Sequence, residues 1–451
     1  MAAAALPTAL SVYWSDEHVG TLHRTDPLSF AYARAWLDKA AAPLHPHIPL
    51  AEGTIATPAV HAFFENLLPE ADQRRIIGLK HQVSSVFGLL ALMGGDTAGA
   101  IVLTPEGERP TPPAYQRLTW DQVNALLHAD GKFVRERAAI EAEAAAAGMP
   151  VPRLSLSGAQ LKMLLSIDEN GNPWRPMGTS PSTHILKPDI VRTDLKLFAS
   201  AVNETIVMRA ARICELPTAR VAYQATTKAC LIERYDRYWR DDRALGRLWQ
   251  ADFCQIAGKA SDEKYEADGG PTLKECYSII RSYSVQPAVD LRNFLRWIFF
   301  NLYVGNNDCH AKNLSMLAGP EGLRLAPFYD LMSTRVYPGL AANFAFRIGG
   351  ESEPGKLASP HLASLADELG LPLKYLTRIA TTMASQVKSA LPQAVEWVKK
   401  DLGPNEAVMA ARLQHKIASV TKRMQARLCG EAPHPEPKDD LEDAPAQGPH
   451  A

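Results

Sequence analysis

The sequence predicts an α+β fold with more than one domain. Short β-prone runs separated by turn signals occur near the start and in the middle of the chain, whereas the pattern beyond residue 275 is largely helical. At 451 residues the chain also exceeds the size at which one hydrophobic core keeps growing. These observations favour two or three folded units, each with its own core.

Composition excludes several classes of protein. Hydrophobic residues make up 46% and charged residues 22%, as in ordinary globular proteins, and a formal net charge of -1 argues against autonomous nucleic-acid binding. The apolar start MAAAALPTAL lacks the basic residues of a signal peptide, and no stretch approaches the length of a membrane span. The six cysteines show no zinc-site spacing. We therefore expect a cytoplasmic protein with buried, reduced thiols.

The first unit is expected over residues 1–110. Residues 11–24 read as two β-prone runs around a turn at DEHVG, and the segment from Pro58 carries apolar residues at helical spacing up to a Gly-Gly stop. The stretch 104–117 is rich in Pro and charge, which predicts a linker.

A second unit is expected over residues 111–236. It should begin with two helices and continue as a hairpin around ENGN, followed by strand, helix, strand and strand. That order occurs in the N-lobe of protein kinases and in many other α+β units. Residues 237–430 should be mainly helical, and the acidic, Pro-rich segment 431–451 a disordered tail.

The motif GNNDCHAKNLSML ends an apolar helical run and sets Asp308 five residues before Asn313. Protein kinases use this spacing in their catalytic loop, where the carboxylate meets the substrate hydroxyl and the amide oxygen helps to hold magnesium. Asp308 is therefore the candidate base and Asn313 a candidate metal ligand. The ordinary alternative is that these residues cap helices.

Two further segments carry charges that a kinase needs. Asp330 ends the β-like run LRLAPFYD and could be the second metal-binding carboxylate; its alternative is a helix N-cap ahead of LMST. Lys187 ends an apolar strand and could contact the α- and β-phosphates, with Glu204 in the next helix as its ion-pair partner. The alternative for Lys187 is a surface lysine beside a proline.

The segment RLSLSGAQLKM carries small and hydroxyl-bearing residues where a kinase has its phosphate-covering loop. It lacks the G-x-G-x-x-G pattern, so backbone N–H groups would contact the phosphates. A plain β-turn at glycine is the alternative. The ATP-binding candidates in this segment are Ser157, Gly158, Ala159 and Lys162, with Ser155 nearby.

These motifs, in this order, resemble the HipA family of toxin kinases over about residues 10–420. The resemblance implies a bilobal, protein-kinase-like body with a small N-terminal α+β domain and a mainly helical C-lobe, acting as a serine/threonine kinase with ATP and Mg²⁺. The matching motifs are FFENLLPE (63–70), SGAQLK (157–162), THILKP (183–188), ERYDR (233–237), YEADGGPTL (265–273), DCHAKN (308–313) and FYDLMS (328–333).

The resemblance also implies partners and regulation. A helix-turn-helix antitoxin would bind the chain and read operator DNA, so that DNA is met only indirectly. The family suggests an aminoacyl-tRNA synthetase as the protein substrate, whose phosphorylation would arrest translation and growth. Ser155 matches the family's autophosphorylated serine, with Ser157 as a second site, and the added charge would expel the loop from beside ATP.

Three residues have expected supporting roles. Glu233 would lie at the interlobe connection near adenine, Asp236 would brace that connection, and His310 would be structural rather than a base. Cys309 departs from the family, in which glycine is common at this position. Two alternatives remain open: a small-molecule phosphotransferase, and a catalytically inactive corepressor that acts with a DNA-binding antitoxin.

Overall fold

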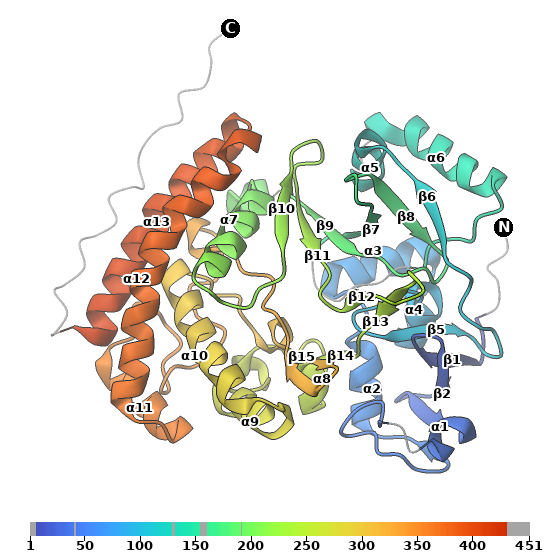
Figure 1. The fold of residues 1–451 in the computed structure, drawn as a ribbon, viewed down its shortest axis with the longest axis horizontal. Helices are drawn as coiled ribbons and strands as arrows, with labels where there is room; N and C mark the ends of the chain where they lie inside the picture. Colours follow the sequence, from blue (N-terminus) through green and yellow to red (C-terminus); the bar gives the residue numbers. More distant parts are fainter. Residues whose placement is uncertain (1–5, 40–41, 129–130, 154–159, 191, 431–451) are drawn as a thin grey trace, which may run out of the picture.

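The computed structural model describes residues 6–39, 42–128, 131–153, 160–190 and 192–430. Figure 1 shows two sheet-containing parts on one side of the molecule and a helical part on the other. The N-terminal strands lie at the lower right, the second sheet lies above them, and the helices of the C-terminal half stand at the left. The predicted α+β architecture is confirmed.

The N-terminal unit is a five-stranded antiparallel sheet in the order β4-β3-β2-β1-β5. The turn predicted at DEHVG lies instead at Ser15 and Asp16, because strand pairing, which joins Tyr13 to His18, continues up to this turn. In this register Val19 is a strand residue whose side chain is buried on the core face. The elements are β1 (Ala9–Trp14), β2 (Glu17–His23), β3 (Ser29–Tyr32), α1 (Arg34–Asp38), β4 (Thr54–Ile55), α2 (Pro58–Glu65), α3 (Ala71–His81), α4 (Val86–Met93) and β5 (Ile101–Pro105).

The second sheet has six strands in the order β10-β11-β9-β7-β8-β6. The predicted succession of hairpin, strand, helix, strand and strand is confirmed. The prediction of a linker is wrong for residues 114–117, because these residues form edge strand β6, which pairs with β8. The elements are β6 (Ala114–Arg117), α5 (Trp120–Leu127), α6 (Val134–Ala146), β7 (Met163–Ile167), β8 (Pro173–Met177), β9 (His184–Pro188), α7 (Ser200–Ile213), β10 (Val221–Gln224) and β11 (Ala229–Glu233).

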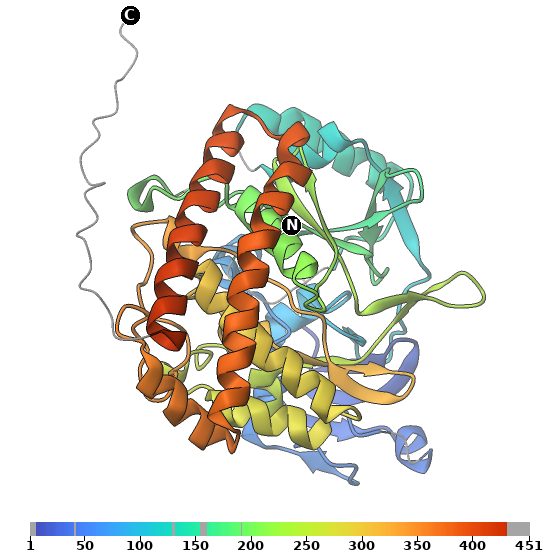
Figure 2. The same cartoon turned by 60° about the vertical axis from the view of Figure 1, so that its left-hand side comes forward.

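The rest of the chain is mainly helical. Figure 2 shows α12 and α13 as a long pair along one face, with α10 behind them. The β-like run predicted to reach Asp330 ends earlier, at Leu325. The elements are β12 (Arg237–Trp239), β13 (Leu245–Arg247), β14 (Gln250–Asp252), α8 (Phe253–Ala257), α9 (Leu273–Tyr283), α10 (Pro287–Val304), β15 (Ser315–Gly319), β16 (Gly322–Leu325), α11 (Ser359–Leu369), α12 (Leu373–Val398) and α13 (Pro404–Cys429).

The cysteines and the helix lengths bear on two further predictions from the sequence. All six cysteines are free thiols, and all but Cys429 are buried, as predicted. Among the described residues, no single helix combines the length and apolar character needed to cross a membrane. Segments Gln73–His81 and Val86–Met93 meet that criterion only when taken together, and they meet at a bend of 81°.

Candidate active site

A cavity of about 610 Å³ lies where the second sheet meets the helical part, a volume typical of small-molecule sites. Its wall combines segments that are far apart in the sequence. They are β9, the interlobe connection 233–236, the loop 306–313 after α10, residues 329–332, and residues 66–73 of the N-terminal unit.

Lys187 lies in this wall between two carboxylates. Its Nζ is 2.7 Å from Oε1 of Glu204 on α7 and 2.6 Å from Oδ1 of Asp330. Burial alone would lower the pKa of Lys187, but the two carboxylates raise it well above its usual range, so the ammonium stays charged. The surface-lysine alternative is wrong, because Lys187 is only 5% exposed.

Asp330 has a backbone conformation that L residues rarely adopt, with φ at 58°. No α-helix begins at LMST, so the N-cap alternative fails. Burial acts against ionisation, but Lys187 and Lys162 hold the pKa of Asp330 well below its usual range. Burial and the charge of Lys187 lower the pKa of Lys162 to about 8. We call Lys162, Lys187, Glu204 and Asp330 the pocket cluster.

The loop that carries Asp308 begins where α10 ends at Gly305. Gly305 is left-handed (φ 69°), and a Cβ there would lie 3.1 Å from Arg335 Cβ, so the position favours glycine. The Asp308 N–H donates to Asn306 Oδ1 (3.2 Å), and Nδ2 of Asn313 donates to the Asp308 carbonyl oxygen (3.1 Å). The loop thus holds the Asp308 and Asn313 pair predicted from their spacing, and neither side chain caps a helix.

The Asp308 carboxylate accepts a hydrogen bond from the Tyr265 hydroxyl on Oδ1. Asp308 as a whole residue is exposed, but desolvation of its carboxyl group by the surrounding protein raises its pKa, while the Tyr265 hydrogen bond and the Lys264 charge act in the opposite direction. The His310 ring packs edge-on against Tyr265, with ring centroids 5.2 Å apart. Burial, reinforced by Lys264, lowers the pKa of His310 to about 3, so its imidazole is neutral. Its Nδ1 has no hydrogen-bond partner among the described residues.

The N-terminal unit supplies residues of this wall that the residue-level analysis did not single out. Lys312 donates to Asn66 Oδ1 and to Asp252 Oδ2, the latter at 2.8 Å, and Lys264 Nζ is 2.7 Å from Glu70 Oε2. Asn66 and Glu70 belong to FFENLLPE, and Lys264 directly precedes YEADGG. The sequence signal for these contacts therefore lies in the two motifs FFENLLPE and YEADGGPTL.

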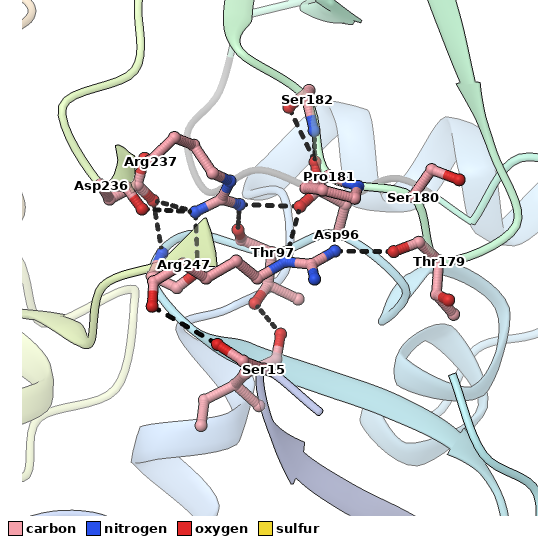
Figure 3. Close-up of polar contacts among 12 residues, drawn as sticks. Ser15, Asp96, Thr97, Thr179, Ser180, Pro181, Ser182, Asp236, Arg237 and Arg247 are labelled. Atoms are coloured by element: carbon pink, nitrogen blue, oxygen red, sulfur yellow. Dashed lines mark hydrogen bonds and ion pairs between the residues drawn. The ribbon is translucent and has the colours of Figure 1, made fainter. Parts of the chain in front are cut away.

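Asp236 lies in a second buried ionic group, which we call the hinge cluster; Figure 3 shows its members Asp96, Asp236, Arg237 and Arg247. Asp236 accepts from Arg234 Nε (2.9 Å) and from the Gly99 backbone N–H (2.7 Å), and it pairs with Arg237 (3.0 Å). Despite burial, Arg234 and Arg237 hold the pKa of Asp236 well below its usual range. These contacts link the interlobe connection to the N-terminal unit. The cluster consists of Asp96, Arg234, Asp236, Arg237 and Arg247.

Asp96 is the centre of the hinge cluster. It is fully buried beside three guanidinium groups: Arg237 at 2.7 Å, Arg234 at 3.2 Å and Arg247 at 3.4 Å. Its Oδ2 also accepts from the Ser182 N–H (3.0 Å) and the Ser182 hydroxyl (2.7 Å). Burial acts against its ionisation, but the three arginines lower the pKa of Asp96. One carboxylate therefore joins the N-terminal unit to both the hinge and the second sheet.

The remaining predicted residues fall into three groups. Glu233 lines the cavity, but its backbone N–H already donates to the Arg220 carbonyl oxygen (2.9 Å). A ligand in the cavity would therefore have to use other backbone groups of the interlobe connection. Cys309 is fully buried and does not line the cavity, so its added bulk does not narrow the pocket. Four predicted residues, Ser155, Ser157, Gly158 and Ala159, lie outside the described residues.

The residues present fit magnesium held together with a nucleotide. Among the described residues, no group of three or more His, Cys, Asp or Glu side chains could hold a metal unaided. Mg²⁺ in phosphoryl-transfer sites is instead bound by one or two protein oxygens together with phosphates and water. Asp330, kept ionised by lysines, and the Asn313 amide offer oxygen atoms of that kind.

Two family models match the chain: the HipA N-terminal domain over residues 10–104 and the HipA-like C-terminal domain over residues 154–391. The second alone spans more than half of the chain. The chain belongs to the HipA family. Its fold accordingly contains the small N-terminal domain and the bilobal, kinase-like body with a helical C-lobe that characterise this family.

The similar proteins match this chain over almost its whole length and over almost the whole of their own. The chain is 35% identical to a Sinorhizobium fredii protein named "Putative kinase Y4mE", covering 92% of this chain and 97% of that protein. It is 30% identical to the serine/threonine-protein kinase toxin HipA of Shewanella oneidensis, covering 93% and 96%. The solved structure of Shewanella oneidensis HipA with HipB and operator DNA matches with a TM-score of 0.76 and 26% identity, covering 92% and 97%.

Proposed function

We propose that this protein is an ATP- and Mg²⁺-dependent serine/threonine protein kinase and the toxin of a toxin–antitoxin pair. The observation that carries the proposal is the meeting of Lys187, Asp308, Asn313 and Asp330 around one cavity. A buried lysine paired with a carboxylate on a helix, a catalytic-loop Asp-Asn pair and a later Asp are the parts that phosphoryl transfer requires.

Each residue has a defined task in this reaction. Bound MgATP supplies the γ-phosphoryl group. Lys187, kept cationic and held by Glu204, contacts the α- and β-phosphates, with Lys162 as a second cation. Asn313 and Asp330 hold the metal, and Asp308 orients the substrate hydroxyl and accepts its proton. The bond from the γ-phosphorus to the β,γ-bridging oxygen breaks as the hydroxyl oxygen bonds to phosphorus, and ADP leaves.

The substrate is a serine or threonine hydroxyl of a protein, with an aminoacyl-tRNA synthetase as the first candidate. The chain's own Ser155 and Ser157 are proposed autophosphorylation sites, while Glu233 and its neighbours in the hinge receive adenine. A helix-turn-helix antitoxin is the proposed partner, because the Shewanella oneidensis relative was solved with HipB and operator DNA. We also propose domain boundaries near residues 110 and 236.

The proposal is tested by incubating the purified chain with Mg²⁺ and radiolabelled ATP and by mapping the label with mass spectrometry. We expect label on Ser155 or Ser157 in the wild type and none in Asp308→Asn. Adding candidate synthetases then tests transfer to another protein. ATP binding without any transfer would favour the inactive-corepressor alternative, and transfer only to small molecules would favour the small-molecule phosphotransferase.

A further inference from the structure

The segment 264–265 joins the N-terminal domain to the catalytic loop. The Lys264 carbonyl oxygen accepts from the Ala311 N–H at 3.3 Å, so its backbone is tied directly to the loop that carries Asp308. Tyr265 adds the hydroxyl contact to Asp308 Oδ1 and the edge-on ring contact to His310. The segment therefore touches the catalytic loop through backbone, ring and hydroxyl.

A tight turn holds Tyr265 in this position. Gly269 has a left-handed conformation (φ 89°), and the Gly270 N–H donates to the Tyr265 carbonyl oxygen at 2.9 Å. A Cβ at Gly270 would lie 2.3 Å from the Glu263 carbonyl oxygen and 2.8 Å from that of Tyr265, which only glycine avoids. The YEADGG motif is thus explained as the turn that brings the Tyr265 hydroxyl to Asp308.

Glu70 anchors this segment from the N-terminal domain. Its Oε2 lies 2.7 Å from Lys264 Nζ and its Oε1 lies 3.9 Å from Lys312 Nζ. Burial would raise the pKa of Glu70, but the charges of Lys312 and Lys264 lower it, so the carboxylate is ionised and balances both cations. Because Lys312 stands within the catalytic loop, Glu70 acts on the loop and on the Tyr265 segment together.

Tyr265 is a donor to one oxygen of the catalytic carboxylate. Burial and the neighbouring Asp308 charge raise the pKa of Tyr265 far above its usual range, so its hydroxyl keeps its proton. A hydroxyl fixed on Oδ1 orients the carboxylate and leaves Oδ2 to receive the substrate proton. Hydrogen bonds to charged groups of this kind are among the stronger ones in proteins.

We infer that Tyr265 and Glu70 are positioning residues that orient Asp308, so that the N-terminal domain completes the catalytic loop. This inference rests on the proposed kinase function and extends it, because the N-terminal domain then contributes to the rate of transfer as well as to the fold. Neither residue contacts the transferred group. Their effect should therefore appear in kcat rather than in the affinity for MgATP.

The chain offers matched controls. Glu65 is as buried as Glu70, each being 5% exposed, and it also joins the two parts, since it accepts from Ser261 Oγ at 2.6 Å. It does not contact Lys264 or Lys312 in any described hydrogen bond or ion pair. Tyr13, on β1, donates to the Glu108 carbonyl oxygen at 3.0 Å, a contact that involves no residue of the catalytic loop. Glu65→Gln and Tyr13→Phe therefore control for the loss of interdomain contact and of a tyrosine hydrogen bond.

The test follows radiolabel transfer from MgATP to Ser155 or Ser157 in the full-length protein. Here kcat is the rate constant of this transfer at saturating MgATP, and KM is the MgATP concentration that gives half of that rate. Both are measured for Tyr265→Phe, Glu70→Gln, their double variant and both controls. We expect kcat to fall about 10-fold or more in each single variant, with the KM for MgATP within about 2-fold of wild type. Because the two residues act as one unit, the double variant should lose little more than the worse single variant. Both controls should keep the wild-type kcat.

Three results would overturn the inference alone: a wild-type kcat in Tyr265→Phe and Glu70→Gln, losses that multiply in the double variant, or an equal loss in Glu65→Gln. A faster Tyr265→Phe would show that the hydroxyl restrains the enzyme and would also overturn it. Absence of transfer by the wild type itself would instead overturn the proposed function, and this inference with it.

Discussion

The hinge cluster and the pocket cluster are both groups of interacting charged side chains, but the hinge cluster is wholly buried whereas Lys162 and Asp330 of the pocket cluster are only partly buried. In the hinge cluster, backbone groups take up much of the remaining hydrogen-bonding capacity: Arg234 donates to Thr97 O (2.7 Å), Arg237 to Gly99 O (2.9 Å) and Arg247 to Thr179 O (2.6 Å). In the pocket cluster, Lys162, Lys187 and Asp330 line the cavity, and 38% of the Asp330 side chain remains exposed.

The difference separates charges that hold a fold together from charges that await a ligand. A buried ion pair contributes little net stability over an apolar core, but removing one partner leaves an uncompensated charge. The hinge cluster therefore fixes how the N-terminal domain and the lobes are joined. The pocket cluster keeps Lys187 and Asp330 ionised for phosphate and metal. Substitutions around the cavity should consequently impair transfer or MgATP binding, whereas substitutions in the hinge cluster should impair stability.

The largest effect is expected for Asp308→Asn, which keeps the shape of the side chain but removes the proton acceptor. Phosphoryl transfer should fall about 10³-fold, while MgATP binding stays close to that of the wild type. Single-turnover transfer and calorimetric titration with MgATP measure the two quantities. Transfer within about 10-fold of wild type would exclude Asp308 as the base.

Lys187→Met should come next, because it removes the phosphate contact and leaves Glu204 and Asp330 without their shared cation. We expect transfer to fall about 10²-fold and MgATP affinity to fall with it. Lys388→Met serves as a control for affinity, since Lys388 contacts Gln425 and does not line the cavity. An unchanged dissociation constant in Lys187→Met would contradict the assigned phosphate contact.

Asp96→Asn tests the hinge cluster. It leaves three buried guanidinium groups facing the single carboxylate of Asp236, so the free energy of unfolding should fall by about 3 kcal/mol. Urea denaturation followed by tryptophan fluorescence measures this loss, with the exposed pair of Lys39 and Glu17 as a control site at which Glu17→Gln should change little. A loss below about 1 kcal/mol would mean that the cluster does not secure the interdomain contact.

The smallest effect concerns pH. The pKa of Lys162 is lowered to about 8, so this cation is present at pH 7 and mostly absent at pH 9. If MgATP binds only the protonated form, its dissociation constant should rise about 10-fold between pH 7 and pH 9. Lys162→Arg stays charged in this range and should flatten the profile. If the dissociation constants of the wild type and of Lys162→Arg changed equally with pH, Lys162 would have no part in phosphate binding.

Much of the pocket could be predicted from the sequence, because its parts are carried by local patterns. The Asp308 and Asn313 spacing lies within one loop, Lys187 ends an apolar strand, and Glu204 lies in the next helix with its carboxylate 2.7 Å from Lys187 Nζ. The family motifs indicated that these residues belong to one site, because the motifs occur along the chain in the order that the family shows. Asp330 was identified by its position after the catalytic loop, although the strand before it ends sooner than predicted.

Asp236 was expected to brace the interlobe connection, but its partner Gly99, the central role of Asp96 and the Glu70 contacts could not be predicted in this way, since only tertiary folding brings these residues together. Gly99 meets Asp236 across 137 positions, and Asn66 meets Lys312 across 246. No periodicity or spacing rule reaches so far. Edge strand β6 was missed for a related reason: its Pro-rich flank is typical of a linker, and pairing with β8 overrides that local signal.

The roles of the two clusters are separated by comparing Asp330→Asn with Asp96→Asn in one assay of Mg²⁺-dependent label transfer, at a temperature at which both variants are folded. We predict that Asp330→Asn is folded but loses transfer by about 10²-fold or more, whereas Asp96→Asn transfers at the wild-type rate per folded molecule. Equal activity in the two variants, or a greater loss in Asp96→Asn, would contradict the assignment of phosphoryl transfer to the pocket cluster.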